Sequence, residues 1–223
     1  MYDFQNKSVL ISGGTTGIGA AIARAFTEAG ATVHALGLET GLNVTDPDTI
    51  QSALTNITTL DILVNAAGVI RRLEEHNPEV FAEVININLN GAMRMCSACY
   101  PLLQQTRGCV INIASMLSFF GSAPAPAYSA SKGGLAQLTK SLALAWAKDH
   151  IRVNALAPGW IETSLTSPLR EDPARSSAIL SRVPVGRWGQ PEDVAGPALF
   201  LASPAASFIT GVILPVDGGY LIA

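Results

Sequence analysis

SVLISGGTTGIG, residues 8–19, is the stretch that decides the fold. Residues 8–11 predict a strand, and their continuous apolar character indicates burial on both faces. From Ile18 to Ala29 the apolar residues recur at helical spacing, and Gly30 ends the helix that they predict. The stretch therefore predicts a buried strand, a glycine-rich turn and a helix in direct succession.

Three glycines of that turn, Gly13, Gly17 and Gly19, stand between a buried strand and the N-terminus of a helix. Backbone can approach a pyrophosphate closely at such a place, and the helix dipole favours the negative charge. The spacing is G-x-x-x-G-x-G and not the common G-x-G-x-x-G, and a tight turn without a ligand is the alternative. The strand before the glycines and the helix after them favour dinucleotide binding.

Short apolar runs alternate with longer helical patterns over the rest of the chain, as in βαβ units around a parallel sheet. We expect further strands at residues 32–36, 42–44, 61–64, 109–113, 151–156 and 212–216, and further helices at residues 81–103, 128–149 and 191–202. Residues 159–190 are polar and interrupted by proline, which is typical of a lid or substrate loop. Without an internal repeat or linker, residues 1–223 are interpreted as a single α/β domain, a doubly wound parallel sheet with helices on both faces.

The composition excludes several other classes of protein. The 223 residues include 14 Lys and Arg and 17 Asp and Glu, with a net charge of −3 and a mean hydropathy of +0.32. The hydropathy excludes a disordered chain, and the charge argues against an electrostatic nucleic-acid binder. Residues 194–216 carry no charge, but Pro197, Pro204 and Pro215 interrupt them, so a buried helix, turn and strand are favoured over a membrane span.

The cysteines and the N-terminus bear on the cellular compartment. Cys96 and Cys99 have the spacing of a redox or metal pair, but no second Cys/His pair accompanies them and they lie in an apolar helical stretch. We therefore expect Cys96, Cys99 and Cys109 to be buried free thiols in a reducing compartment, with no metal site. The first residues, MYDFQNK, lack the apolar core of a signal peptide. We expect a cytoplasmic protein.

Further polar residues follow in an order that carries chemistry: Asn65-Ala66-Ala67-Gly68 after an apolar strand, then Asn88, Ser115, Tyr128 and Lys132. Tyr128 and Lys132 form the pattern Y-x-x-x-K, and their i, i+4 spacing puts both side chains on one helix face. Singly, each has an ordinary interpretation. Tyr128 could be a surface ring, Lys132 a solvated charge, Ser115 a strand-end cap and Asn88 a packing amide.

Together, in this order, the residues resemble the short-chain dehydrogenases/reductases. The resemblance implies an enzyme that transfers a hydride between a nicotinamide cofactor and a carbinol carbon. It implies that Tyr128 is the general acid/base, that Lys132 lowers the pKa of Tyr128 and binds the nicotinamide ribose, that Ser115 hydrogen-bonds the substrate oxygen, and that Asn88 holds a water that relays protons from Lys132. The tyrosine needs such help because its ordinary pKa of about 10 makes it a poor base at neutral pH.

The match covers nearly the whole chain, including Pro158-Gly159 and residues 216–219, and it also implies cofactor contacts. These are Gly13, Thr16, Gly17, Ile18, Gly19, Gly37, Asn43, Asn65, Ala66, Gly68, Tyr128, Lys132, Pro158, Gly159, Ile161 and Thr163. Thr163 matches the position whose hydroxyl meets the nicotinamide carboxamide, and Ile161 offers backbone there. A helix N-cap is the other, compatible interpretation of Thr163.

NAD-dependent members of the family usually carry an acidic residue directly after the second strand, and this chain has no acidic residue at that position. That acid hydrogen-bonds the ribose 2′-hydroxyl, whereas NADP users place an Arg nearby. Here Gly37 stands at that position, followed by Leu38 and Glu39, and neither the glycine loop nor residues 32–56 contain an Arg or Lys for a 2′-phosphate. We therefore expect NAD to be favoured over NADP.

The same region is short. Five residues, 37–41, separate the strand at residues 32–36 from the apolar residues 42–44, whereas a parallel crossover needs roughly a dozen or more residues. The helix between strands two and three is therefore deleted, and strand three must be displaced, shortened or lost. Asn43 stands where the family commonly has an adenine-contacting Asp. We expect an open adenosine pocket with weak discrimination between NAD and NADP.

Within the family, the chain resembles sugar-acid dehydrogenases of the 2-deoxygluconate 3-dehydrogenase and gluconate 5-dehydrogenase type. The matching stretches are residues 68–72, 113–119 and 183–189. Arg71 and Arg72 follow the carboxyl end of a strand, where ligands collect in open α/β sheets, and an Arg can bind a carboxylate. A solvated loop or a subunit contact is the alternative for both arginines. Met116 and Trp160 complete the expected substrate contacts.

The sequence is compatible with three functions, which differ in the features that they require. The first is a sugar-acid or polyol dehydrogenase. The second is a reductase of another carbonyl, such as a 3-oxoacyl thioester, although the charge-poor chain supplies little of the basic surface that a carrier's phosphate needs. The third is a catalytically silent dinucleotide-binding sensor, against which the intact set of Ser115, Tyr128 and Lys132 argues. Family members are usually tetramers, so the resemblance implies a homotetramer without nucleic-acid or membrane partners.

Overall fold

A six-stranded parallel sheet is the centre of the computed structural model, which describes residues 2–223. The strands are β1 (Ser8–Ser12), β2 (Thr32–Leu36), β3 (Ile62–Asn65), β4 (Cys109–Ile113), β5 (Arg152–Pro158) and β6 (Ile213–Val216). They lie in the order β2-β1-β3-β4-β5-β6, and each neighbouring pair is parallel. The α/β fold expected from the alternating sequence pattern is confirmed.

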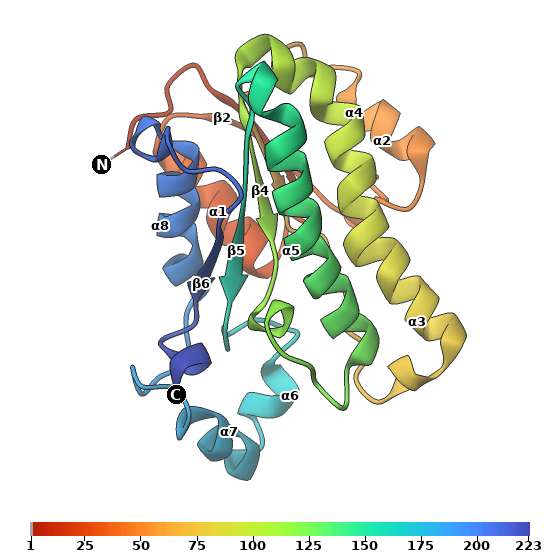
Figure 1. The fold of residues 1–223 in the computed structure, drawn as a ribbon, viewed down its shortest axis with the longest axis vertical. Helices are drawn as coiled ribbons and strands as arrows, with labels where there is room; N and C mark the ends of the chain where they lie inside the picture. Colours follow the sequence, from red (N-terminus) through yellow and green to blue (C-terminus); the bar gives the residue numbers. More distant parts are fainter. Residues whose placement is uncertain (1) are drawn as a thin grey trace.

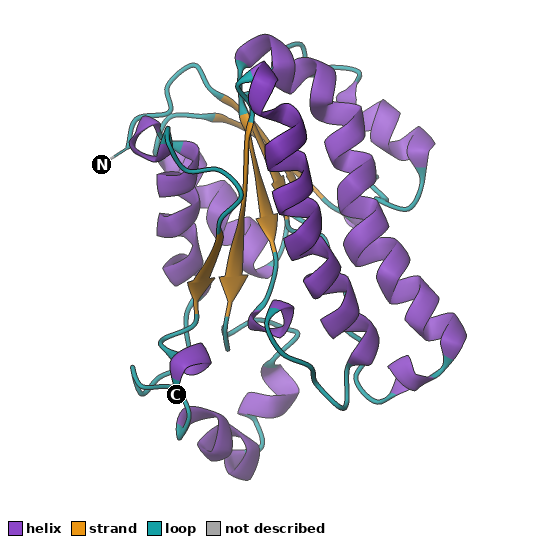
Figure 2. Ribbon diagram, viewed as in Figure 1, coloured by secondary structure: helices purple, strands orange, loops and turns teal. Residues whose placement is uncertain are grey.

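Helices cover both faces of the sheet (Figure 1). One face carries α1 (Gly17–Glu28) and α8 (Pro191–Ala202), and the other carries α2 (Pro47–Leu54), α4 (Gly91–Thr106) and α5 (Pro126–Trp146). Figure 2 shows the strands as one layer between these two helical layers. Two short helices, α6 (Ser167–Arg170) and α7 (Pro173–Leu180), lie beyond the arrowheads of β5 and β6.

The strands are apolar throughout because successive residues face opposite helical layers. In β1, Val9 and Ile11 pack with residues of α1 and α8, whereas Leu10 packs with residues of α4. All three side chains are fully buried, as expected for a parallel sheet that is covered on both faces. The uncharged residues 194–216 form most of α8, a 3₁₀ turn and β6. Within residues 2–223, no helix combines the length and apolarity that a bilayer crossing needs.

The helix expected at residues 81–103 is divided into three segments. It begins as α3 (Pro78–Ile85), continues as a π-helical turn at Asn86–Asn90, and resumes as α4. A π-turn widens the helical ladder locally and occurs often at functional sites. The helix expected at residues 128–149 begins earlier, at Pro126, because proline suits the first helical position.

Between β2 and residues 42–44, the described chain forms only a 3₁₀ turn at Leu38–Thr40, so the deletion of a helix at this point is confirmed. The Leu42 N–H donates to the Gly37 carbonyl (2.9 Å) and closes this turn. The strand expected at residues 42–44 is lost, because a turn this tight leaves too little chain to return to the start of β2. Leu42 and Val44 are buried in the cluster with α4 instead, and β2 is left at the edge of the sheet.

Candidate active site

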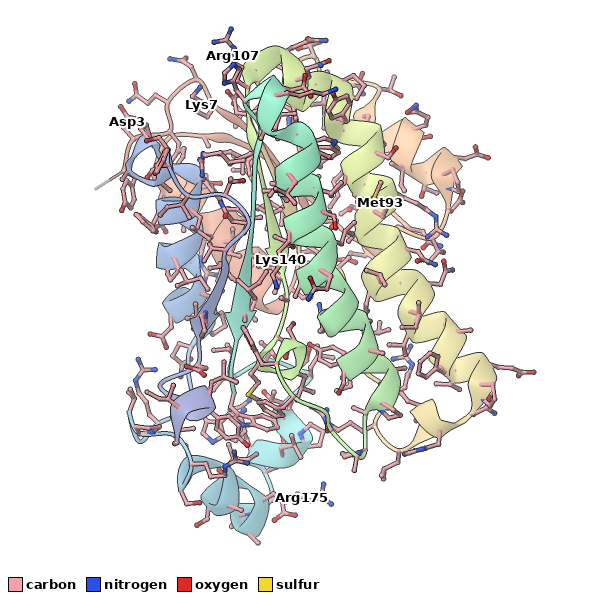
Figure 3. The ribbon with its side chains drawn as sticks, viewed as in Figure 1. Asp3, Lys7, Met93, Arg107, Lys140 and Arg175 are labelled. Atoms are coloured by element: carbon pink, nitrogen blue, oxygen red, sulfur yellow. The ribbon has the colours of Figure 1, made fainter. Side chains whose placement is uncertain are left out.

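A cavity of about 330 Å³ opens at the carboxyl ends of the strands. In Figure 3, Arg175 on α7 marks the end of the molecule toward which the carboxyl ends of the strands point. Asp3, Lys7 and Arg107 lie at the opposite end. Ligands of open α/β sheets bind at the carboxyl edge. The cavity brings together most of the predicted site: Gly13, Thr16, Gly17, Ile18, Gly19, Ala66, Gly68, Arg72, Ser115, Met116, Tyr128, Lys132, Pro158, Gly159, Trp160, Ile161 and Thr163.

The glycine-rich loop packs so closely on its neighbours that side chains are excluded. Gly13 has φ = +67°, and a Cβ there would lie 2.6 Å from the Ala67 nitrogen. A Cβ on Gly19 would collide with the Gly13 carbonyl oxygen. At the start of α1, within the described chain, Thr16 makes no capping hydrogen bond through its side chain, and the first turn has no acidic residue. The free N–H groups of this turn fit the pyrophosphate of a dinucleotide.

Tyr128 and Lys132 lie one turn apart on α5 and both line the cavity. Lys132 is 4% exposed, and its Nζ donates to the Ile113 carbonyl (2.7 Å) and lies 5.5 Å from the centre of the Tyr128 ring. Burial lowers the pKa of Lys132 to about 8, so the ammonium form still predominates at neutral pH. A positive charge therefore stands beside the phenol.

The surroundings of Tyr128 act on its ionisation in opposite directions. Burial raises the pKa of Tyr128 above its ordinary value, and the negative charge of Glu75 acts in the same direction. The Ser115 hydroxyl and the Arg72 guanidinium oppose the rise in pKa because both favour the phenolate. The Tyr128 phenol is therefore protonated at neutral pH. Additional positive charge beside it would lower its pKa and favour the phenolate.

Ser115 follows β4 and caps the 3₁₀ turn at Met116–Ser118, with its Oγ accepting the Leu117 N–H (3.1 Å). The turn is fastened to α5, because the Ser118 hydroxyl donates to the Lys132 carbonyl (2.7 Å). The cap and the place in the cavity are thus both found for Ser115.

Asn88 lies in the π-helical turn and is 1% exposed. Its Oδ1 accepts the Val69 N–H (2.8 Å), and its Nδ2 donates to the Val69 carbonyl (2.9 Å) and the Ser131 hydroxyl (3.1 Å). The amide therefore fastens the loop after β3 to α5, and Asn88 is not among the residues that line the cavity.

Three of the expected cofactor residues also lie outside the lining of the cavity. Asn65 is buried, and its Nδ2 donates to Asn112 Oδ1 (2.9 Å) across the sheet. Asn43 closes its own turn, because its Oδ1 accepts the Thr45 N–H (3.0 Å). Gly37 follows β2, where a Cβ would stand only 2.7 Å from Thr15 Oγ1.

Glu39 fills the space beside Gly37. Its Oε2 lies 2.9 Å from the point at which a Cβ on Gly37 would stand. A hydrogen bond with Thr15 of the glycine-rich loop lowers the pKa of the Glu39 carboxyl. A carboxylate therefore stands next to the end of β2 although the residue that follows the strand is glycine.

The neighbouring arginines point to different places. Arg72 lines the cavity, and its guanidinium donates to the Leu165 carbonyl (3.0 Å); burial lowers its pKa. Arg71 instead pairs with Glu83 of α3 at 3.4 Å, and both side chains are exposed. The structure brings Arg72 to the cavity and directs Arg71 to the surface.

Thr163 lies at the start of the segment that covers the cavity. Its Cγ2 is 3.4 Å from the point at which a Cβ on Gly17 would stand, so this segment meets the glycine-rich loop. The N-cap of α6 is Thr166, so the alternative interpretation of Thr163 as a helix N-cap is wrong. Thr166 occupies the N-cap position without a side-chain cap, and its hydroxyl instead bonds the Ile161 and Thr163 carbonyls (2.6 and 3.1 Å).

Two features of the site could not be predicted from the neighbouring sequence: the aromatic contacts of Trp160 and the burial of Glu75. Trp160 packs edge-on against Trp188 and Tyr220, with 5.9 and 6.2 Å between ring centres, and forms an aromatic wall from distant segments. Glu75 is 1% exposed, although it stands in a charged stretch beside the exposed Glu74.

The glycine cradle, the open N-terminus of α1 and the Tyr128–Lys132 pair define a dinucleotide-dependent oxidoreductase. A family model described as enoyl-(acyl carrier protein) reductase matches residues 34–221. The chain belongs to the short-chain dehydrogenase/reductase family.

Several proteins similar to this chain are named as dehydrogenases of sugar acids. The chain is 42% identical to the 2-dehydro-3-deoxy-D-gluconate 5-dehydrogenase of Bacillus subtilis, over 99% of this chain and 96% of that one. A structure of a candidate 2-deoxy-D-gluconate 3-dehydrogenase from Agrobacterium tumefaciens with bound NADP is 41% identical, with a TM-score of 0.92 over 99% and 98% of the two chains. A gluconate 5-dehydrogenase from Burkholderia cenocepacia, in complex with NADP and tartrate, is 32% identical, with a TM-score of 0.92 over 99% and 97%. The predicted similarity to sugar-acid dehydrogenases is confirmed.

Proposed function

We propose that the protein interconverts a secondary alcohol and a ketone on a sugar acid or polyol, by hydride transfer to or from a nicotinamide dinucleotide. The observation that carries the proposal is the position of Arg72, which brings a partly buried cation to the cavity that also contains Ser115, Tyr128 and Lys132. A guanidinium can bind a carboxylate in a bidentate manner. The names of the relatives at 41–42% identity support a sugar acid.

In the proposed mechanism, the bound dinucleotide supplies the hydride acceptor or donor. In the oxidation direction, the Tyr128 phenolate takes the proton of the substrate hydroxyl while the Ser115 hydroxyl hydrogen-bonds the same oxygen. The Lys132 ammonium, 5.5 Å from the ring, favours the phenolate. In the reduction direction, Tyr128 returns the proton to that oxygen.

Asn88 and residues 159–190 support this chemistry in the proposal. A Cβ on Gly68 would lie 3.2 Å from Asn88 Oδ1 and 3.6 Å from Lys132 Nζ, so the absence of a side chain at Gly68 leaves room between these two groups. A water in that room would relay protons from Lys132 past Asn88. Ile161 and Thr163 line the cavity at the start of the lid at residues 159–190, where they would contact the nicotinamide of a bound dinucleotide. Met116 and Trp160 border the substrate.

We further propose that NAD is the favoured dinucleotide and that Glu39 is the reason. Its carboxylate beside Gly37 can accept hydrogen bonds from the ribose hydroxyls and repels a 2′-phosphate. The turn at Leu38–Thr40 leaves the adenosine pocket open, so the expected difference between the dissociation constants of NAD and NADP is less than a hundredfold. In Glu39→Gln this difference shrinks, whereas Glu28→Gln, on the outside of α1, leaves it unchanged. Tighter binding of NADP than NAD by the wild type contradicts this part of the proposal.

The assembly and compartment are proposed on separate observations. Large apolar side chains at Phe208 and Ile222 are almost fully exposed in the single chain, and so is Leu144 on α5, which favours a homotetramer that covers them. Light scattering of the purified protein measures the assembly.

Three buried free thiols favour the reducing cytoplasm.

The deciding experiment follows reduced nicotinamide by absorbance with hexonates, deoxy- and keto-sugar acids, neutral polyols and a 3-oxoacyl thioester. Turnover of sugar acids at much higher kcat/KM than the thioester supports the proposal. Preference for the thioester favours the alternative reductase, and dinucleotide binding without turnover of any substrate favours a silent sensor.

A further inference from the structure

Glu75 is a buried carboxylate that the proposed chemistry does not use. Its Oε1 accepts the Arg71 N–H (2.8 Å) and its Oε2 accepts the Tyr128 N–H (2.8 Å). Burying a charged carboxylate costs several kcal/mol unless its oxygens are hydrogen-bonded. These two backbone donors, one on each oxygen, come from the two segments that carry Arg72 and Tyr128.

No side chain next to the start of α5 accepts a hydrogen bond from its first N–H groups, and a distant side chain accepts one instead. Ala125 occupies the N-cap position, Pro126 follows it, and the first turn contains no acidic residue. The Tyr128 N–H has no partner within the helix, and Glu75, 53 residues earlier in the chain, accepts it. A Ser or Asp at position 125 would satisfy α5 locally. The distant carboxylate adds a link between α5 and the loop after β3.

That loop is joined to the segment before α5 at two further points. The Leu73 N–H donates to the Pro124 carbonyl (2.7 Å), and His76 Nε2 lies 3.0 Å from the Ala123 carbonyl oxygen. Leu73 has φ = +70°, a left-handed conformation that is costly for leucine. Arg72 immediately precedes this strained residue, so its direction depends on the contacts that hold the turn.

We propose that Glu75 is a positioning residue for the reaction, which fixes Tyr128 relative to Arg72 by holding the first turn of α5 against the arginine loop. The inference rests on the proposed function, because Glu75 acts through Tyr128 and Arg72. A displacement of about 1 Å between reacting groups can cost as much as a hundredfold in rate.

Glu75 also contributes a charge. The charged groups that face Tyr128 are Arg72, which favours the phenolate, Glu75, which opposes it, and Lys132 on α5, while Ser115 contributes a hydroxyl. The Lys132 ammonium, 5.5 Å from the ring centre, favours the phenolate as a nearby positive charge. Removal of the Glu75 charge therefore lowers the pKa of Tyr128. Loss of a purely structural cap would leave this pKa where it is.

The test is Glu75→Gln, which keeps the size of the side chain but removes its charge and one acceptor. We expect kcat to fall about tenfold, KM for a sugar acid to rise, and the acid limb of the oxidation rate to move to lower pH. The dissociation constant of the dinucleotide should change little, and the thermal midpoint should fall by only a few degrees, since one buried N–H loses its acceptor. Glu74→Gln makes the same charge change at the exposed neighbour and should match the wild type throughout.

Kinetics of Glu75→Gln that match those of Glu74→Gln overturn the inference, as does a parallel loss of kcat, dinucleotide affinity and thermal midpoint with an unmoved pH limb. If Glu75→Gln does not fold, Glu75→Asp retains the charge but shortens the side chain; a lowered kcat with an unmoved pH limb is then expected, and an unchanged kcat overturns the inference. Ionisation of Tyr128 can also be followed without substrate, as the difference in phenolate absorbance between each protein and its Tyr128→Phe counterpart. An unshifted ionisation in Glu75→Gln overturns the inference even if the proposed function itself fails for lack of turnover.

Discussion

Tyr128 allows the proposed acid/base role to be tested by the removal of one oxygen. Tyr128→Phe retains the ring that packs above Lys132 but removes the proton donor, so we expect kcat to fall by about 10²–10⁴-fold. The dissociation constant of the dinucleotide should stay within about twofold of the wild type, as measured by calorimetry. A variant that keeps more than a tenth of the wild-type kcat contradicts the role of Tyr128.

The adjacent arginines allow carboxylate binding by Arg72 to be tested with Arg71 as a matched control. Arg72→Ala removes the cation from the cavity, and we expect KM for a hexonate to rise about tenfold or more, since a hydrogen bond to a charged group is worth about 1.5–3 kcal/mol. KM for a neutral polyol should change little. Arg71→Ala removes an exposed partner of Glu83 and serves as the control. Equal effects of Arg72→Ala on acidic and neutral substrates refute carboxylate binding.

Among single residues, those in ordered motifs could be predicted and those positioned by distant contacts could not. Tyr128 and Lys132 share a helix face by spacing alone, and both reach the cavity. Nothing local distinguishes Glu75 from Glu74, because the burial of Glu75 depends on an N–H donor 53 residues away. The same limit applies to Arg71 and Arg72, whose directions depend on α3 and on the lid.

At the scale of the element, the βα turn at residues 12–19 depends on the absence of side chains. A Cβ on Gly19 meets the Gly13 carbonyl, so Gly19→Ala should lower the free energy of unfolding by about 1–3 kcal/mol and weaken dinucleotide binding at least tenfold. Gly133, inside α5, has open space around its Cβ position. Gly133→Ala should instead leave binding unchanged and stabilise the helix by up to about 1 kcal/mol. Urea unfolding and dinucleotide titration check both variants.

The elements that departed from the sequence pattern did so where tertiary packing outweighed periodicity. Leu42 and Val44 alternate like strand residues, but burial against α4 satisfies both of them without a strand partner. The apolar pattern over residues 81–103 is continuous, and it does not reveal that Asn86–Asn90 widens into a π-turn, in which Asn88 fastens the loop after β3 to α5.

At the scale of the whole molecule, the two faces of one sheet explain both the apolar composition and the buried thiols. Cys96 and Cys99 pack between α4 and the sheet, and Cys109 lies within β4. Burial raises the pKa of Cys96 to about 12 and that of Cys109 to about 11. We expect none of the three thiols to react with a disulfide reagent in the native protein at pH 8, and all three to react after unfolding in urea. Cys109 packs on the α1 and α8 side of the sheet and the other two thiols on the α4 side, so rapid labelling of a native thiol would contradict the packing of the face on which it lies.

The raised thiol pKa values also link stability to pH, with a definite sign. An unfolded cysteine ionises near pH 8.5, whereas Cys109 in the folded protein keeps its proton until about pH 11, so its contribution to stability is complete below pH 8.5 and is lost as the pH rises toward 11. Lys132 acts in the opposite sense, because its folded pKa of about 8 lies below the unfolded value. The contribution of Cys109 can be isolated by comparison with Cys109→Ala, whose cavity costs the same at every pH. Between about pH 9 and 11, the wild type should lose about 1.4 kcal/mol per pH unit relative to the variant, measured by urea unfolding at each pH. A difference in stability that does not change with pH would show that Cys109 ionises alike in the folded and unfolded chains.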